Sequence, residues 1–273
     1  MEARSYASGT VINALASGIG SAFALELETR VRLKIENDLK ESVLLVNGVE
    51  RDASLIENLI EERVVVEVRT EIPEGCGLGS SSAFMNALIA AYFKSKNLDL
   101  DAREILVKNA RISLRSGISY TGAFDDAAAS LLGGLVVSDN RIMKLKLWRK
   151  IKGDAIVLLP SWKREEISLA RIRESTTLIE QALRDVMEGD FCSAMLRNSI
   201  HYCNAIGYPL APVEESLEIG VCGGLSGNGP AYTAFGDSVG ELQNAWSEFG
   251  EIIKTRIATK PAENVKIPDT LFE

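Results

Sequence analysis

Two aspartates stand side by side at Asp125 and Asp126, directly before a run of small residues, A-A-A-S, that is typical of a closely packed helix. Adjacent carboxylates at a helix start could simply cap the helix and interact with its dipole. For an arbitrary pair of aspartates, this capping role is the more common one. A chemical role for the pair requires a second site that holds the reacting group.

That second site is predicted at residues 72–83, where the chain reads I-P-E-G-C-G-L-G-S-S-S-A. Gly75, Gly77 and Gly79 free the backbone to approach a ligand, and the serines that follow begin an apolar helical pattern. Unpaired N–H groups at that helix start, together with the helix dipole, would bind an anion such as phosphate. Since one glycine is enough for a tight turn, three glycines favour a binding site over a simple turn.

Two commoner glycine loops do not match this stretch. A P-loop ends in Gly-Lys-Ser or Gly-Lys-Thr, whereas Gly79 is followed by Ser80 and the stretch contains no lysine. A dinucleotide-binding fingerprint would need glycine at position 80 or 82, and both are serine. The sequence therefore predicts a phosphate-binding loop of another kind, which we call the first glycine loop (residues 73–83).

A second glycine-rich stretch, V-C-G-G-L-S-G-N-G-P-A-Y-T-A-F, covers residues 221–235 and ends in a predicted strand. Its glycines could form a second cradle for phosphate groups. Within this stretch, we call Ser226, Gly227, Asn228 and Gly229 the second glycine loop.

Strands and helices must position these groups. Residues 24–35 alternate charged and apolar side chains, which indicates a half-buried strand with its charges outward. Val64 to Arg69 form a strand that leads into the first glycine loop, and Asp101 and Glu104 have the spacing of a helix capping box.

Composition and charge exclude several classes of protein. The chain has 273 residues, of which 46% are hydrophobic, so a large core is expected. A net charge of −8 argues against nucleic acid or an anionic membrane as the main partner. No apolar run approaches the about 20 residues that span a bilayer, and the N-terminus does not resemble a signal peptide. Four cysteines without a C-x-x-C pair, and a single histidine, argue against a zinc site and fit a reducing cytoplasm.

The first glycine loop contains the pattern P-x-x-x-G-L-G-S-S-x-A, which resembles the signature of the GHMP kinases, the superfamily of galactokinase, homoserine kinase and mevalonate kinase. The resemblance implies a two-domain α+β fold with mixed sheets, and the use of ATP and Mg²⁺. It places around the ATP phosphates the second glycine loop and Pro73, Glu74, Gly75, Cys76, Gly77, Leu78, Gly79, Ser80, Ser81, Ser82 and Ala83. It implies that Ser81, or else Ser80 or Ser82, helps to hold magnesium. We expect an N-terminal ATP-binding domain at 1–150 and a C-terminal α/β domain at 151–273.

The resemblance also gives the aspartates a catalytic role but leaves the register open. Members similar to mevalonate kinase carry an aspartate before an A-x-S-x-x-G-G run, which selects Asp126 here. Alignment on homoserine kinase selects Asp125 instead, so both remain candidates for the catalytic base.

Four segments resemble the archaeal-type shikimate kinases within this superfamily: T-V-I-N-A-L-A-S-G-I-G-S-A-F from Thr10, A-R-I-S-L-R-S-G, T-G-A-F-D-D-A and G-G-L-S-G-N-G-P-A-Y. This resemblance implies transfer of the ATP γ-phosphoryl group to the 3-hydroxyl of shikimate. Guanidinium groups bind carboxylates through paired hydrogen bonds, so Arg4, Arg111 and Arg115 are candidates for the shikimate carboxylate. Thr10 stands where many GHMP enzymes have a lysine.

Three other activities remain open from sequence: homoserine kinase, a kinase or decarboxylase of the mevalonate pathway, and a non-catalytic nucleotide-binding regulator. Homoserine would present an amino group that calls for extra acidic ligands. A regulator could lose the aspartates, so the retained pair argues against it. The sequence sets no oligomeric state.

Overall fold

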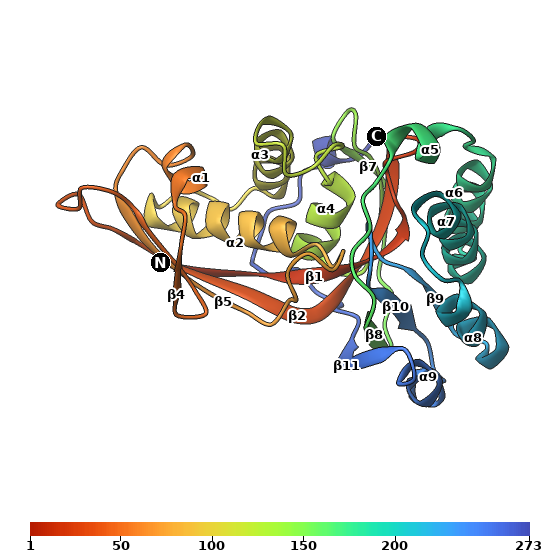
Figure 1. The fold of residues 1–273 in the computed structure, drawn as a ribbon. Coiled ribbons are helices and arrows are strands. Elements are labelled where there is room, and N and C mark those ends of the chain that lie inside the picture. The colour runs from red at the N-terminus through yellow and green to blue at the C-terminus, as the bar shows by residue number, and fades with distance from the viewer.

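The structure is a computed structural model that describes residues 1–273 as two β-sheets covered by helices (Figure 1). The strands of the first sheet are β1 (Glu2–Ile12), β2 (Ile19–Ile35), β3 (Val43–Val46), β4 (Val49–Arg51), β5 (Val64–Thr70), β6 (Leu135–Asp139) and β7 (Lys144–Arg149). The strands of the second sheet are β8 (Asp154–Pro160), β9 (Cys222–Leu225), β10 (Tyr232–Phe235) and β11 (Gly250–Arg256).

Strand β2 organises the first sheet. The sheet has the order β4-β3-β5-β2-β6-β7, and β1 pairs antiparallel with the other edge of β2. The start of β2 pairs with β6 and its end with β5, while β3 and β5 form the one parallel pair. The predicted alternation is confirmed, since Leu25, Leu27, Val31 and Leu33 are buried between exposed or half-buried charged residues.

Helices cover one face of the first sheet and flank the second sheet (Figure 1). The helices of the first half are α1 (Ser54–Glu57), α2 (Ser80–Ser95), α3 (Ala102–Arg115) and α4 (Phe124–Leu132). Those of the second half are α5 (Leu169–Arg173), α6 (Thr177–Glu188), α7 (Phe191–Ile206), α8 (Ala211–Ile219) and α9 (Val239–Trp246), and a 3-10 turn follows at Asp269–Leu271. The predicted start of α3 is confirmed, because the Asp101 side chain accepts a hydrogen bond from the amide of Glu104. No helix combines the length and apolar character needed to cross a membrane.

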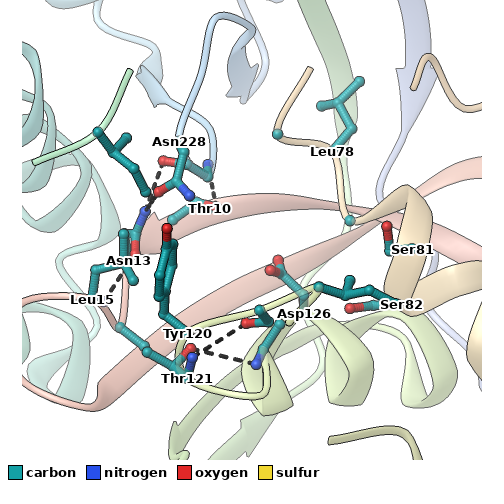
Figure 2. A pocket seen from close by; sticks show the side chains of 18 of the residues that line it. Thr10, Asn13, Leu15, Leu78, Ser81, Ser82, Tyr120, Thr121, Asp126 and Asn228 are labelled. Atoms are coloured by element: carbon teal, nitrogen blue, oxygen red, sulfur yellow. Dashed lines mark hydrogen bonds between the residues drawn. The ribbon is translucent and has the colours of Figure 1, made fainter. Parts of the chain in front are cut away.

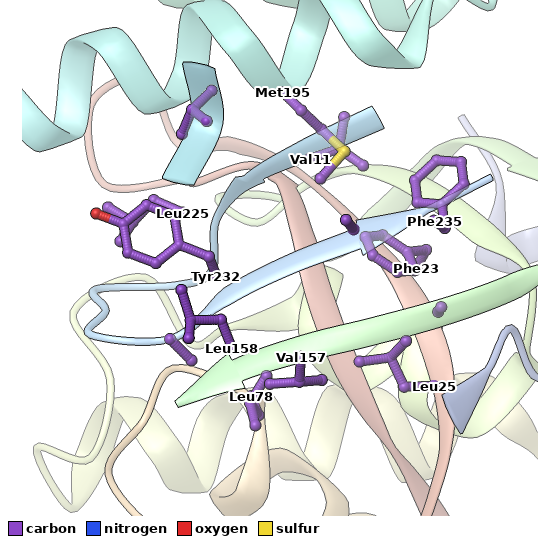
Figure 3. Close-up of a cluster of buried hydrophobic side chains, with 14 of the residues drawn as sticks. Val11, Phe23, Leu25, Leu78, Val157, Leu158, Met195, Leu225, Tyr232 and Phe235 are labelled. Carbon is purple, nitrogen blue, oxygen red and sulfur yellow. The ribbon is translucent and has the colours of Figure 1, made fainter. Parts of the chain in front are cut away.

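Two hydrophobic cores hold these layers together. One packs α2, α3 and α4 against the first sheet. The other, shown in Figure 3, joins residues of the first two strands, such as Phe23 and Leu25, to Val157 of β8 and Met195 of α7. Strands β1 and β2 contribute to both cores, so they connect the two halves of the molecule.

The C-terminal segment returns to the first half after β11. The amide of Ala258 donates to the carbonyl of Ala24 at 3.1 Å, and the amide of Ala262 donates to Leu131 at 2.9 Å. The expected limit near residue 150 falls between β7 and β8, where the chain changes sheets. We therefore propose a first domain of residues 1–150 with 257–273, and a second of 151–256.

Two of the four cysteines form a disulfide, whereas a reducing cytoplasm would favour four free thiols. Cys192, at the start of α7, is bonded to Cys222, at the start of β9. Cys76 and Cys203 are free thiols. The disulfide joins segments that lie 30 residues apart in the sequence, and no local motif such as C-x-x-C marks it.

Candidate active site

Helix α2 begins at the end of the first glycine loop with its amide groups free. Its N-cap is Gly79, which has a φ of 66° and provides no capping side chain. The amides of Ser80, Ser81 and Ser82 have no backbone or side-chain acceptor. A Cβ at Gly79 would lie 2.1 Å from Ser8 Oγ, so only glycine fits there. These unpaired donors and the positive end of the helix dipole form an anion-binding site.

The two glycine loops contact each other. A Cβ at Gly77 would lie 2.2 Å from the Ser226 carbonyl oxygen, so glycine permits this approach. Ser226 Oγ donates to the Gly77 carbonyl at 2.9 Å, and the amide of Ala231 donates to the Cys76 carbonyl at 3.1 Å. Hydrogen bonds thus join two loops whose bonded residues Ser226 and Gly77 are 149 positions apart in the sequence.

Side chains from the end of β1 and the residue that follows it fix the second glycine loop (Figure 2). Thr10 Oγ1 accepts a hydrogen bond from the Gly227 amide at 2.8 Å. Asn13 Nδ2 donates to the Gly227 carbonyl at 2.8 Å and to Asn228 Oδ1 at 2.9 Å. The threonine hydroxyl accepts this hydrogen bond, which a lysine ammonium group has no lone pair to do.

The aspartate pair lies in the first turn of α4. Asp125 is buried and accepts a hydrogen bond from Asn140 Nδ2 at 2.8 Å. A Cβ at Gly20 would lie 2.1 Å from Asp125 Oδ2, so this glycine makes room for the carboxylate. Asp126 is half-buried and accepts a hydrogen bond from Ser8 Oγ at 2.8 Å.

Burial disfavours the charged form of both carboxyl groups. It raises the pKa of Asp125, although the hydrogen bond from Asn140 acts in the opposite direction. For Asp126, burial and then the neighbouring charge of Asp125 raise the pKa to about 8, against the lowering effect of Ser8. In the unliganded protein, both carboxyl groups therefore keep a proton to higher pH than an exposed aspartate does.

A cavity of about 560 Å³ lies between the starts of α2 and α4 and the second glycine loop. Figure 2 shows Asp126 and Ser82 on this cavity, from the two helix starts. The predicted site residues that line it are Gly75, Gly77, Leu78, Gly79, Ser80, Ser81, Ser82, Asp125, Asp126, Gly227 and Asn228. Five other predicted residues do not line it: Pro73, Cys76, Ala83, Ser226 and Gly229. Glu74 lines a neighbouring cavity.

The structure does not bring the three predicted arginines to the cavity. Arg4 pairs with Glu28 at 2.6 Å and its Nε donates to the carbonyl of Ala262, while Arg111 and Arg115 are exposed on α3. Their contribution to carboxylate binding therefore has no support from their positions. Sequence reasoning missed Arg164, which lines the main cavity, and Arg173, which lines an adjoining one, because neither belongs to a local motif.

Smaller cavities adjoin the main one at both ends. One, of about 380 Å³, shares Gly75, Ser80 and Ser81 with it. The other, of about 360 Å³, shares Leu15 and Thr121 with it. The shared lining residues show that each smaller cavity lies next to the main one.

The residues present fit a magnesium ion that arrives with a nucleotide. No group of three or more His, Cys, Asp or Glu side chains could hold a metal ion by itself. Magnesium usually keeps several waters and binds through one or two carboxylates together with substrate phosphates. Asp126 and the hydroxyl of Ser81 both line the cavity and would supply such protein ligands.

Comparisons with known proteins place the chain in a family. A family model described as GHMP kinases N terminal domain matches residues 45–134. The chain is 48% identical to a shikimate kinase of Archaeoglobus fulgidus, with 100% of this chain and 98% of that one covered. It is 34% identical to a shikimate kinase of Pyrococcus abyssi, with 91% and 96% covered.

The fold agrees with this assignment. The structure is similar to the crystal structure of Methanococcus jannaschii mevalonate kinase, with a TM-score of 0.74, 15% identity and coverage of 94% of this chain and 98% of that one. At that identity the likeness shows the fold alone, and it confirms the predicted α+β fold with mixed sheets. The chain belongs to the GHMP kinase superfamily and, within it, to the archaeal-type shikimate kinase family.

Proposed function

We propose that this chain transfers the γ-phosphoryl group of ATP to the 3-hydroxyl of shikimate, giving shikimate 3-phosphate and ADP. The identity of nearly half the residues to a shikimate kinase over the full length carries the proposal. The site supports it, because a carboxylate faces an open helix start across one cavity. Since ATP is a cytoplasmic metabolite, we also place the reaction in the cytoplasm.

ATP would extend from the 380 Å³ cavity into the main one. Its phosphates would bind the free amides of Ser80, Ser81 and Ser82, where the dipole of α2 favours negative charge. The purine would occupy the smaller cavity, whose apolar lining includes Leu44 and Phe84. Bound magnesium would neutralise charge on the phosphate oxygens, with Ser81 and Asp126 as its protein ligands.

We assign the base to Asp126 and a supporting role to Asp125. Both aspartates line the cavity, but Asp126 is half-buried, whereas Asp125 is buried and held by Asn140. Burial, and then the neighbouring charge of Asp125, raise the pKa of Asp126 and so make its carboxylate a stronger base. In its deprotonated form, Asp126 would take the proton of the 3-hydroxyl as that oxygen attacks the γ-phosphorus.

The 360 Å³ cavity would hold the acceptor. Arg173 lines it, donates from Nε to the Leu15 carbonyl at 3.1 Å, and forms no ion pair. We therefore propose Arg173 for the shikimate carboxylate, rather than Arg141, which is paired with Asp139. No acidic side chain lines this cavity, and this disfavours the amino group of homoserine.

The test is ADP release by the purified protein with ATP and Mg²⁺, comparing shikimate with homoserine, mevalonate and no acceptor. We expect release with shikimate alone. ADP release with another acceptor would contradict shikimate as the substrate. No ADP release with any acceptor would contradict the kinase activity.

Arg173→Met tests the acceptor site. We expect the KM for shikimate to rise about 10- to 100-fold while the KM for ATP stays within about threefold, because one charged hydrogen-bonded pair is lost. Arg171→Met is the matched control, since Arg171 is exposed on the same helix and does not line the cavity. Equal KM values in the two variants would remove Arg173 from the site.

A further inference from the structure

The main cavity is lined by more acidic than basic side chains. Its lining contains four acidic residues, Asp125, Asp126, Glu165 and Glu166, and one cationic side chain, Arg164. A nucleoside triphosphate adds further negative charge, and phosphoryl transfer depends on positive groups that neutralise it. The first glycine loop contains no lysine that could do so. Any cation that the protein itself supplies must therefore come from Arg164 or from a side chain outside the cavity.

Arg164 is placed beside the first glycine loop with most of its hydrogen-bonding capacity free. Its Nη1 donates to the Gly75 carbonyl at 3.1 Å, and this is its one hydrogen bond. It forms no ion pair with the adjacent Glu165 or Glu166. A guanidinium has five N–H donors in a planar fork, so the remaining donors can bind phosphate oxygens.

The segment that carries Arg164 is attached to the second glycine loop as well. It connects β8 to α5, and the amide of Glu165 donates to Tyr208 Oη at 2.9 Å. Tyr208 Oη in turn donates to the Asn228 carbonyl at 3.4 Å. A Cβ at Gly229 would lie 2.5 Å from the Tyr208 ring, so this glycine permits the contact. Tyr208 thus links the segment that carries Arg164 to the second glycine loop through hydrogen bonds.

We propose that Arg164 is a catalytic residue that binds the β- and γ-phosphates of ATP. It would neutralise the charge that develops as the acceptor oxygen bonds to the γ-phosphorus and the bond from that phosphorus to the bridging oxygen of ADP breaks. Arg164 itself is unchanged by the reaction. The proposal rests on the ATP use of the proposed function and is independent of which hydroxyl compound accepts the phosphoryl group.

The test compares Arg164→Met with Lys163→Met, a neighbouring exposed cation that does not line the cavity. Calorimetry with ATP and with ADP, both with Mg²⁺ and without acceptor, measures what Arg164 contributes to γ-phosphate binding. We expect Arg164→Met to weaken ATP binding about 10-fold more than ADP binding, and kcat/KM for ATP to fall about 100-fold or more. The KM for the acceptor should change less than about threefold. Lys163→Met should resemble the natural protein.

Two further variants distinguish direct binding of phosphate by Arg164 from a purely structural role of this residue. Arg164→Lys should keep part of the activity, since it retains the charge without the planar fork. Arg164→Ala should recover activity when methylguanidinium is added, which a purely structural defect would not allow. Equal ATP and ADP losses, or values that match Lys163→Met, would overturn the proposal. Because binding is measured without acceptor, a failure of shikimate as substrate leaves this test intact.

Discussion

The two walls of the main cavity use similar small and polar residues in opposite ways. The helix wall, made by residues 79–82 and 125–126, presents free amides and two carboxyl groups of raised pKa. In the strand wall, made by Thr10, Asn13 and residues 226–229, most polar groups are bound to one another. The helix wall is therefore suited to bind and react with substrates, and the strand wall to hold the second glycine loop in place.

This difference assigns separate tasks to two glycine-rich loops that look alike in sequence. The glycines of the first loop open a helix start, because Gly79 replaces a capping side chain. Those of the second loop permit close packing, because Gly227 lies against Gly77 and Gly229 against Tyr208. Free polar groups at a functional site cost stability that the rest of the protein must supply. Variants of the two walls should therefore have opposite effects on stability.

The largest effect on turnover is expected for Asp126→Asn in the helix wall. We expect kcat to fall about 100-fold or more, the scale of a general base, with the affinity for ATP in the absence of Mg²⁺ almost unchanged. The melting temperature should rise, because a buried carboxyl group of raised pKa is replaced by a neutral amide. Steady-state kinetics and thermal unfolding measure both quantities. Unchanged turnover would remove Asp126 from the mechanism, and a lower melting temperature would contradict the contrast between the walls.

The pH dependence of stability should report the raised pKa of Asp126 in the helix wall. Between the unperturbed pKa of 3.8 and the folded-state pKa of about 8, folded Asp126 keeps a proton that the unfolded chain has lost. The free energy of unfolding should therefore fall as the pH rises through this range. Urea unfolding at several pH values should give a shallower slope for Asp126→Asn, with a residual slope from Asp125. Identical slopes would show that the pKa of Asp126 is not raised.

A smaller effect on turnover is expected for Asn13→Ala in the strand wall. The variant loses the hydrogen bonds to Gly227 and Asn228, so we expect a stability loss of about 2 kcal/mol. The KM for ATP should rise about 10-fold, because the second loop no longer holds the first, while kcat changes less. Asn228→Ala removes one of these two bonds and should give a milder form of both effects. A fall in kcat equal to that of Asp126→Asn would overturn the division of tasks.

The smallest effect on turnover is expected for loss of the disulfide between Cys192 and Cys222, which lies outside both walls. The double variant Cys192→Ser with Cys222→Ser should be less stable by about 3 kcal/mol, because the unfolded chain gains freedom, with kcat nearly unchanged. Thiol titration of the unfolded natural protein should find the two free thiols, Cys76 and Cys203. Four reactive thiols would show that the bond does not form in the cell.

Much of the fold was predictable because its signals are local. The alternation along β2, the capping residues of α3 and the glycines before α2 each depend on neighbours in the chain, and each is confirmed. The return of residues 257–273 to the first sheet was not predictable, because its hydrogen bonds join residues far apart in the sequence. Strand β9 was also missed, because Gly223 and Gly224 resemble loop residues, although their lack of side chains permits packing against Ser216 and Ser199.

By itself, the sequence determined the family, the open helix start at the first glycine loop and the presence of an aspartate pair, since each is written in a short motif. Only the tertiary structure decided how these groups are used. It buried Asp125 against Asn140, left Asp126 half-buried in the cavity lining, and placed Arg164 in the lining of the main cavity and Arg173 in that of an adjoining one. The physical reason is that burial, pKa and charge neutralisation depend on distances between elements, which a local pattern does not contain.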